Sequence, residues 1–144
     1  MGIDLMDWEA IPDFGIYSEQ LLSIINKEIY NHDDPLSSSM VNNYVKKKYI
    51  EKPVKRKYYR DQVAALILIS LFKGVLNMDD LSYALNILID KYGLEDTYKR
   101  FKAAFKGEES EDKLIENMVE MIKAKNKIEE IIFEERSDTN EVIQ

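Results

Sequence analysis

Cysteine is absent from this chain of 144 residues, and histidine occurs once. A chain without cysteine cannot form disulfides, iron–sulfur clusters, thiolate metal sites or a cysteine nucleophile. The one histidine, His32, stands beside Asp33 and Asp34 in a predicted turn, and a single imidazole without cysteine cannot supply an ordinary zinc site. We therefore expect His32 to be a solvated loop residue, and we expect no metal and no other cofactor.

Long apolar runs and catalytic motifs are also missing. The longest strongly apolar stretch, Val63–Phe72, is half the length of the roughly 20 residues that a membrane span needs. Residues 1–13 carry acids and Trp8 where a signal peptide would have a basic segment and then an apolar one. No phosphate-binding glycine loop, His-Glu-x-x-His or Gly-x-Ser-x-Gly motif occurs. We expect a cytoplasmic protein that has no membrane contact and is not an enzyme.

Glycine and proline are scarce, at 5 and 3 residues, and the abundant Leu, Ile, Glu and Lys favour helices. Apolar residues recur at helical spacing, and turn residues separate the segments. We predict an all-α fold, with Gly74, Gly93 and Gly107 at helix ends and Asn77 as a helix cap. Residues 54–59 should form a short hairpin or loop. The predicted helices span about 18–30, 39–48, 60–73, 78–92, 94–106 and 111–135.

The charge is unevenly distributed. The chain carries 20 basic and 27 acidic residues, yet residues 46–60 hold eight basic residues against Glu51 alone. This segment has a net charge of +7, which leaves −14 for the rest of the chain. Contact with a polyanion should therefore be local to the basic segment. A solvated basic helix with a basic loop would show the same run.

The predicted helix at 39–48 has two faces. At about 100° per residue, Val41, Tyr44 and Val45 fall on one side, which we expect to be buried. The other side carries the amide and ammonium groups that can contact base edges, because Asn can pair with adenine and Lys with guanine or phosphate oxygens. This outward set is Ser39, Asn42, Asn43, Lys46 and Lys47. The segment after it adds Lys52, Lys55, Arg56, Lys57 and Arg60 for contact with the sugar-phosphate backbone.

Residues 40–63 resemble two families. The segments Met-Val-Asn-Asn-Tyr-Val-Lys-Lys-Lys-Tyr-Ile at 40–50, Pro53, and Lys-Tyr-Tyr-Arg-Asp-Gln-Val at 57–63 resemble the winged helix-turn-helix of MerR-type regulators. Asn77-Met78-Asp79-Asp80-Leu81 is similar to the segment that opens a later helix in that family. The same residues more closely resemble a family of uncharacterised bacterial proteins, a domain of unknown function.

The resemblance implies a winged helix-turn-helix head at 15–92 with a short β wing or loop. C-terminal helices would follow at 93–136 and a frayed tail at 137–144, all within a single domain of residues 1–144. It also implies a DNA-binding transcriptional regulator that acts as a homodimer on double-stranded DNA. The chain departs from the MerR pattern at Asn42, where Arg is usual, at Lys48 and Lys57, where Gly is usual, and at Tyr59, where Ser would cap the next helix.

Two other functions remain open on the sequence alone. A protein-interaction module would keep the winged fold and use its basic face for an acidic partner, including its own acidic remainder. A ligand sensor would enclose a cavity lined by Tyr83, Tyr92, Tyr98, Phe101 and Phe105, although packing is the commoner use of such residues. Trp8, Phe14 and Tyr17 form either a lid over a pocket or, more often, a staple for an N-terminal arm.

The last predicted helix carries a long apolar stripe that includes Leu114, Met118, Ile128 and Ile132. A strict heptad is broken at residues 123–127. Packing within the chain and pairing with a second chain explain this stripe equally well.

Overall fold

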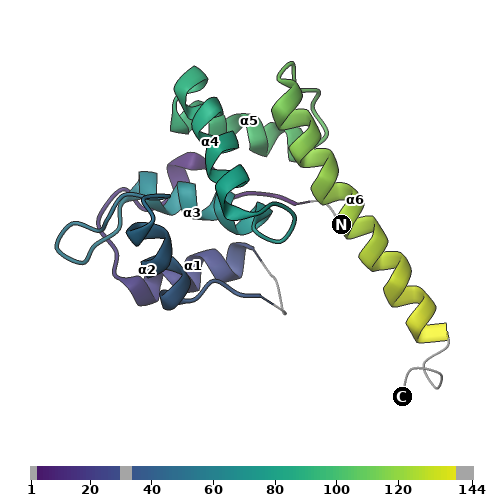
Figure 1. Cartoon of the computed structure of the whole chain (residues 1–144), viewed down its shortest axis with the longest axis horizontal. Helices are drawn as coiled ribbons and strands as arrows, with labels where there is room; N and C mark the ends of the chain where they lie inside the picture. The colour runs from purple at the N-terminus through teal and green to yellow at the C-terminus, as the bar shows by residue number, and fades with distance from the viewer. Residues whose placement is uncertain (1–2, 30–33, 139–144) are drawn as a thin grey trace.

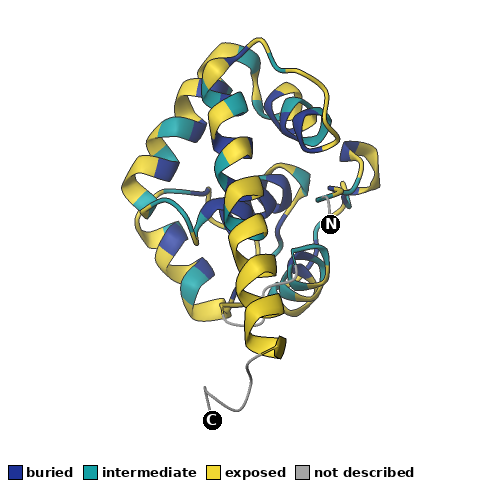
Figure 2. Cartoon of the chain, turned by 90° about the vertical axis from the view of Figure 1, so that its right-hand side faces the viewer, coloured by how far each residue is buried: buried dark blue, intermediate teal, exposed yellow. Residues whose placement is uncertain are grey.

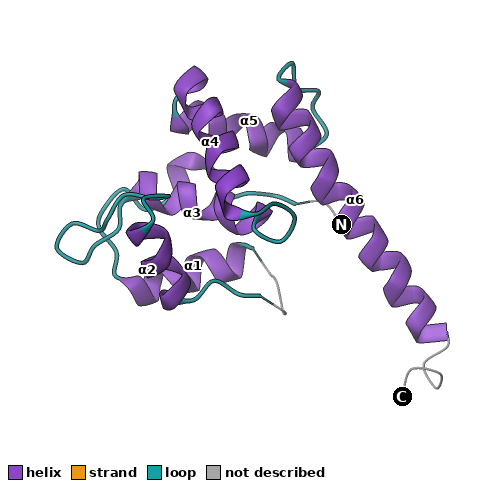
Figure 3. Cartoon of the chain, in the orientation of Figure 1, coloured by secondary structure: helices purple, strands orange, loops and turns teal. Residues whose placement is uncertain are grey.

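The computed structural model describes residues 3–29 and 34–138, which form six α-helices and a short 3-10 helix (Figure 1). No β-strand occurs among these residues (Figure 3), so the segment expected to be a short β wing or loop is a loop with two isolated bridges, Ile16 with Tyr58 and Val54 with Lys57. The elements are η1 (Trp8–Ala10), α1 (Ser18–Glu28), α2 (Ser38–Lys46), α3 (Arg60–Phe72), α4 (Met78–Tyr92), α5 (Leu94–Phe105) and α6 (Lys113–Asp138).

Helix α3 lies at the centre of the fold because its sequence is apolar on nearly every side. Ten of its 13 residues are buried, and α1, α4, α5 and α6 all pack against it. The ring of Phe72 at its end lies 5.3 Å from Phe101 and 6.2 Å from Phe105. The core therefore continues from α3 into α5, across the expected boundary at residues 92–93.

The N-terminal arm is held against this core. Trp8 is buried and meets the ring of Tyr98 edge-on at 5.8 Å. The Tyr98 hydroxyl donates a hydrogen bond of 2.6 Å to the carbonyl of Met6, and burial raises the pKa of this tyrosine. Trp8 is thus a staple, whereas Phe14 and Tyr17 remain 67% and 53% exposed and belong to neither a staple nor an enclosed lid.

Helices α1 and α3 begin in the same way and side by side. The backbone N–H groups of Tyr17 and Tyr59 each donate to the side-chain oxygen of a glutamine three residues later, Gln20 and Gln62. Directly before these positions, Ile16 and Tyr58 exchange two backbone hydrogen bonds of 2.9 and 2.8 Å. The pairing joins the arm to the segment that precedes α3, and Tyr59 stands at the N-cap of α3 in place of the usual Ser.

Most of the other predicted helix ends are confirmed. The Asn77 side chain accepts a hydrogen bond from the Asp80 backbone at 2.9 Å, and Gly93 and Gly107 take the left-handed φ values of 81° and 98°. Gly74 does not adopt a left-handed φ. The N–H groups of Val75 and Leu76 both bond to the Phe72 carbonyl instead.

Helix α6 begins and ends later than predicted. Asp112 is buried and its carboxylate accepts hydrogen bonds from the backbone of Leu114 and Ile115, so the helix begins at Lys113. At the other end, Ser137 and Asp138, expected in the frayed tail, are helical, and residues 139–144 lie outside the described part. The second half of α6 projects from the body of the protein (Figure 1).

Candidate nucleic-acid interface

Helix α2 has the two faces that its sequence predicts. Val41 is fully buried and Tyr44 is 5% exposed, while Val45 packs against the core from a half-buried position. The outward residues of the predicted site are all exposed: Ser39, Asn42, Asn43, Lys46 and Lys47. The helix spans Ser38–Lys46 rather than residues 39–48, with the Ser37 hydroxyl oxygen accepting a hydrogen bond from the Met40 N–H.

Three contacts hold α2 on the body. The Asn26 side chain of α1 makes two hydrogen bonds to the backbone of Leu36, of 2.9 and 2.8 Å, just before α2. The Tyr49 hydroxyl beyond α2 donates to the Asp79 carboxylate at the start of α4, which raises the pKa of Tyr49. Lys73 at the end of α3 binds the carboxylate and carbonyl of Asp34. The orientation of α2 is therefore set by α1, α3 and α4 together.

The C-terminal end of α2 uses Lys48 where glycine is usual. Lys48 has a φ of 64°, and its N–H bonds to the Val45 carbonyl while that of Tyr49 bonds to the Tyr44 carbonyl. These two hydrogen bonds are the Schellman pattern that ends many helices. A side chain in this left-handed conformation costs about 1–2 kcal/mol relative to ordinary backbone, so Lys48 keeps its charge at an energetic cost.

The segment between α2 and α3 is a tight hairpin. Val54 and Lys57 exchange backbone hydrogen bonds of 3.0 and 2.9 Å, which leaves Lys55 and Arg56 as a two-residue tip. Both tip residues have positive φ values, 52° and 69°. Two positive φ values are what a two-residue hairpin with a type I′ turn requires, and Asn-Gly is the usual pair there. Here two long basic side chains occupy the strained positions.

The base of the hairpin is held by Gln62, which is not among the predicted site residues. Its side-chain amide donates to the carbonyls of Glu51 and Lys52 at 3.1 and 2.8 Å, while its oxygen accepts from the Tyr59 N–H at 2.7 Å. Gln62 is 8% exposed. A polar residue next to the apolar run of helix α3 was the available signal, because a buried amide is almost always hydrogen-bonded.

Gly15 brings the N-terminal arm against the same hairpin. A Cβ atom at this position would come within 2.8 Å of the Lys57 side chain and 2.9 Å of the Tyr59 ring. The Lys57 ammonium lies 5.5 Å from the centre of the Tyr17 ring, and Lys57 is half-buried. The hairpin is thus supported on one side by the arm and on the other by α3.

The structure separates the basic residues of the predicted site into two groups. Lys52, Lys55 and Arg56 are exposed together with the α2 residues. Arg60 turns toward the N-terminal arm, where its guanidinium donates to the carbonyls of Ile11 and Glu9 at 2.9 and 3.2 Å and lies 5.9 Å from the Trp8 ring. The described contacts of Arg60 therefore hold the arm and do not extend the exposed basic surface.

The exposed cations of this surface have no ion-pair partner in the part of the chain that the structure describes. Within residues 3–29 and 34–138, no ion pair involves Lys46, Lys47, Lys48, Lys52, Lys55 or Arg56. Elsewhere pairing is common: Lys99 binds Glu9 and Glu95, and Lys102 binds Asp4. In the described part of the chain, the acidic remainder therefore does not cover the basic surface.

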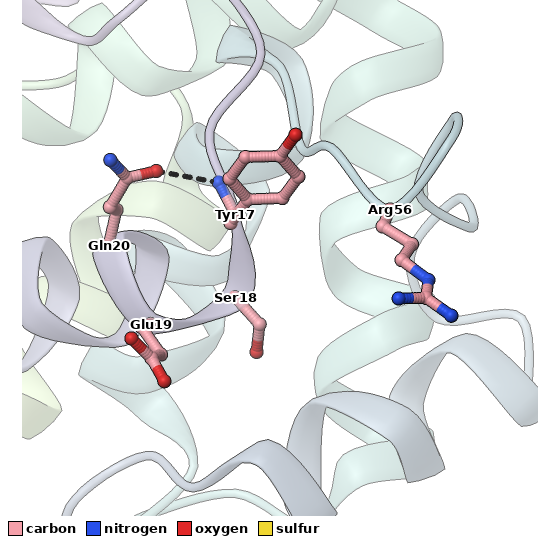
Figure 4. Close-up of a pocket in the computed structure, with 5 residues that line it drawn as sticks. All are labelled: Tyr17, Ser18, Glu19, Gln20 and Arg56. Atoms are coloured by element: carbon pink, nitrogen blue, oxygen red, sulfur yellow. Dashed lines mark hydrogen bonds between the residues drawn. The ribbon is translucent and has the colours of Figure 1, made fainter.

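An open recess of about 440 Å³ lies beside the hairpin (Figure 4). The first residues of α1, Ser18, Glu19 and Gln20, line it with Tyr17, and Arg56 faces them from the hairpin tip. A helix N-terminus and a guanidinium both favour an anion, whereas the Glu19 carboxylate opposes one. The recess therefore joins α1 to the basic surface without forming an enclosed ligand site.

The five aromatic residues considered for a ligand cavity are divided between the core and the surface. Tyr98, Phe101 and Phe105 are buried in the core, whereas Tyr83 is 72% exposed and Tyr92 lies under the Arg100 guanidinium at 3.8 Å. His32 lies outside the described residues. In the part of the chain that the structure describes, no three His, Asp or Glu side chains gather as a metal site, and no helix combines the length and apolarity needed to cross a membrane.

These observations define an all-helical protein with an exposed basic surface built from α2 and the hairpin at 54–57. Residues 6–106 match the family described as domain of unknown function DUF1836, which covers more than two thirds of the chain. The chain belongs to this family. No match was found among curated proteins or among solved structures. The matched region contains the whole basic surface and ends before α6.

Proposed function

We propose that this protein binds double-stranded DNA and acts as a transcriptional regulator. In this proposal α1 and α2 form a helix-turn-helix, with α2 as the groove-reading helix and the hairpin at 54–57 as a short wing. The observation that carries it is the open basic surface on an otherwise acidic protein. Its cations are exposed and unpaired among the described residues, and its chemistry suits both base edges and phosphates.

The two parts of the surface would have different roles. Asn42, Asn43 and Lys46 on α2 would face the floor of the major groove, where amide and ammonium groups distinguish bases. Lys55 and Arg56 at the hairpin tip would contact phosphates, which contributes affinity without sequence preference. The left-handed φ values of the tip residues support this role, because backbone strain at a surface turn is retained where the side chains are useful.

A titration by fluorescence anisotropy tests the proposal. The probes are a random duplex and a pool with a randomised site, each at about 50 and 200 mM salt. Lys55→Ala should weaken binding to all sequences about equally and lower the salt slope by about one. Asn43→Ala should cost about 1–3 kcal/mol at one base position only. Lys106→Ala, which removes an exposed lysine at the end of α5, is the matched control and should change neither quantity.

Two results would overturn the proposal. The first is no saturable binding even at low salt, which would favour an acidic protein as the partner of the basic surface. The second is binding that Lys55→Ala and Lys106→Ala weaken alike, because this would reflect general charge rather than the surface described. Enrichment of a sequence with two-fold symmetry from the randomised pool would support a homodimer that reads two half-sites.

A further inference from the structure

The two halves of α6 carry separate apolar faces. In the first half, Ile115, Met118, Val119 and Ile122 are buried against the body. In the second half every residue from 127 to 138 is exposed (Figure 2), including Ile128 at 57%, Ile131 at 48% and Ile132 at 45%. Three branched apolar side chains on one exposed helical segment form a surface that soluble proteins usually cover.

The exposed stripe does not continue the buried face. At about 100° per residue, Ile128, Ile131 and Ile132 fall within one arc, together with Ala124 and Glu135. The centre of this arc lies about 140° around the helix from the centre of the buried face. Bending α6 toward the body would therefore not bury the stripe. The switch occurs at residues 123–127, where the sequence breaks its heptad.

We propose that the second half of α6 pairs in antiparallel orientation with the same segment of a second copy of this chain. Ala124, Ile128, Ile131 and Glu135 follow one another at intervals of four, three and four residues, which is the spacing of a coiled-coil seam. In the antiparallel register Ile128 packs against the partner's Ile131, and Ala124 lies opposite the partner's Glu135.

The charges of this segment select the antiparallel orientation. Three of its four basic residues, Lys123, Lys125 and Lys127, come before Ile128, whereas its acidic residues and Arg136 come after it. An antiparallel pair places Lys127 beside the partner's Glu134, twice by symmetry. Neither Lys127 nor Glu134 has an ion pair among the described residues. A parallel pair would instead set Glu135 against the partner's Glu135 at the seam, where like charges repel.

This inference deepens the homodimer of the proposed function, but the surface and the test involve no DNA. A two-fold axis through the paired α6 segments would relate the two basic surfaces, as a symmetric site on DNA requires. If the chain dimerises and does not bind DNA, the proposed function fails alone. If the chain binds DNA but stays monomeric at every concentration without DNA, only the inferred dimer is refuted.

The experiment is sedimentation equilibrium of the full chain without DNA over a concentration series up to about 1 mM. The wild-type mass should rise from 16.9 kDa toward twice that value. The double variant Ile128→Asp/Ile131→Asp should remain monomeric. Ile87→Asp is the matched control, because Ile87 is a 40% exposed isoleucine on α4, and its dimerisation should equal that of the wild type.

Charge exchange tests the orientation. Lys127→Glu and Glu134→Lys should each weaken the dimer by about tenfold, because each creates two like-charge pairs. The combination Lys127→Glu/Glu134→Lys should return the dissociation constant to within about threefold of the wild type. A wild-type chain that stays monomeric at every concentration would overturn the dimer, and a failure of the combination to restore it would overturn the antiparallel register.

Discussion

Replacement of the hairpin tip Lys55-Arg56 by Asn-Gly should make the protein more stable and a weaker DNA binder. Both residues hold left-handed φ values of 52° and 69°. This region costs a non-glycine residue about 1–2 kcal/mol, whereas it carries no steric penalty for glycine and a smaller one for asparagine. Glycine offsets about 0.5–1 kcal/mol of this gain through the entropy of the unfolded chain.

The net gain should therefore be about 1 kcal/mol for the double replacement, which corresponds to a rise in Tm of about 2–4 °C for a chain of this size. Urea unfolding followed by circular dichroism measures the first quantity, and a thermal scan measures the second. Lys106→Asn is the control, because Lys106 has an ordinary φ of −80° and its replacement should leave stability nearly unchanged.

The same double variant should lose two phosphate contacts. For each protein, the affinity for duplex DNA falls by some factor between about 50 and 200 mM salt. This factor should be about tenfold smaller for the double variant than for the wild type, since each contact contributes about 0.9 to the salt slope. A variant no more stable than the wild type would refute the argument from strain. A more stable variant with the wild-type salt slope would show that the hairpin tip does not touch DNA.

Three further predictions concern the supports of the surface. Lys48→Gly should stabilise the protein by about 0.5–1 kcal/mol in urea unfolding, because glycine adopts the left-handed φ of 64° without the steric cost of a side chain; a loss of stability would contradict the strain inferred at this position. Gln62→Leu should destabilise by about 1–3 kcal/mol, because it leaves two backbone carbonyls at the hairpin base without their donor, and faster hydrogen exchange at residues 51–59 should accompany it. Burial raises the pKa of Asp112, but hydrogen bonds from the Tyr92 hydroxyl and two backbone N–H groups, with a nearby ammonium, lower it below its usual value overall. The charged form thus stabilises the fold above the unfolded-state pKa, near 4, and this contribution disappears as the pH falls through the lower folded-state pKa. The stability of Asp112→Asn, measured by urea unfolding, should therefore depend less on pH below the unfolded-state pKa, and an unchanged pH dependence there would refute the assignment.

Helix positions were largely predictable because their signals are local. Asn77 and Gly93 indicated both ends of α4 as observed, Met78–Tyr92, since a cap and a left-handed glycine act within one helical turn. The exposed and buried faces of α2 followed from the 3.6-residue period. The all-helical class of the fold and the exposure of Asn43 and Lys46 therefore follow from local patterns in the sequence.

The contacts between distant segments were not predictable in the same way. Arg60 belongs to the basic run in sequence, yet its guanidinium binds the carbonyls of residues 9 and 11, because the arm folds back across the start of α3. Gln62 supports the hairpin only because α3 places it beneath residues 51 and 52. The turn at Lys55-Arg56 lacks the Asn-Gly signal that would have indicated its type.

The sequence by itself determined where the helices lie, where the positive charge is concentrated and which face of α2 is polar, because helix caps, net charge and periodicity depend on residues within a few positions of one another. Only the tertiary structure decided which cations stay open, how the hairpin is held, and that the apolar stripe of α6 divides into a buried face and an exposed one. These features depend on which surfaces meet across the core, where α1, α4, α5 and α6 pack against α3. No local pattern in the sequence specifies that packing.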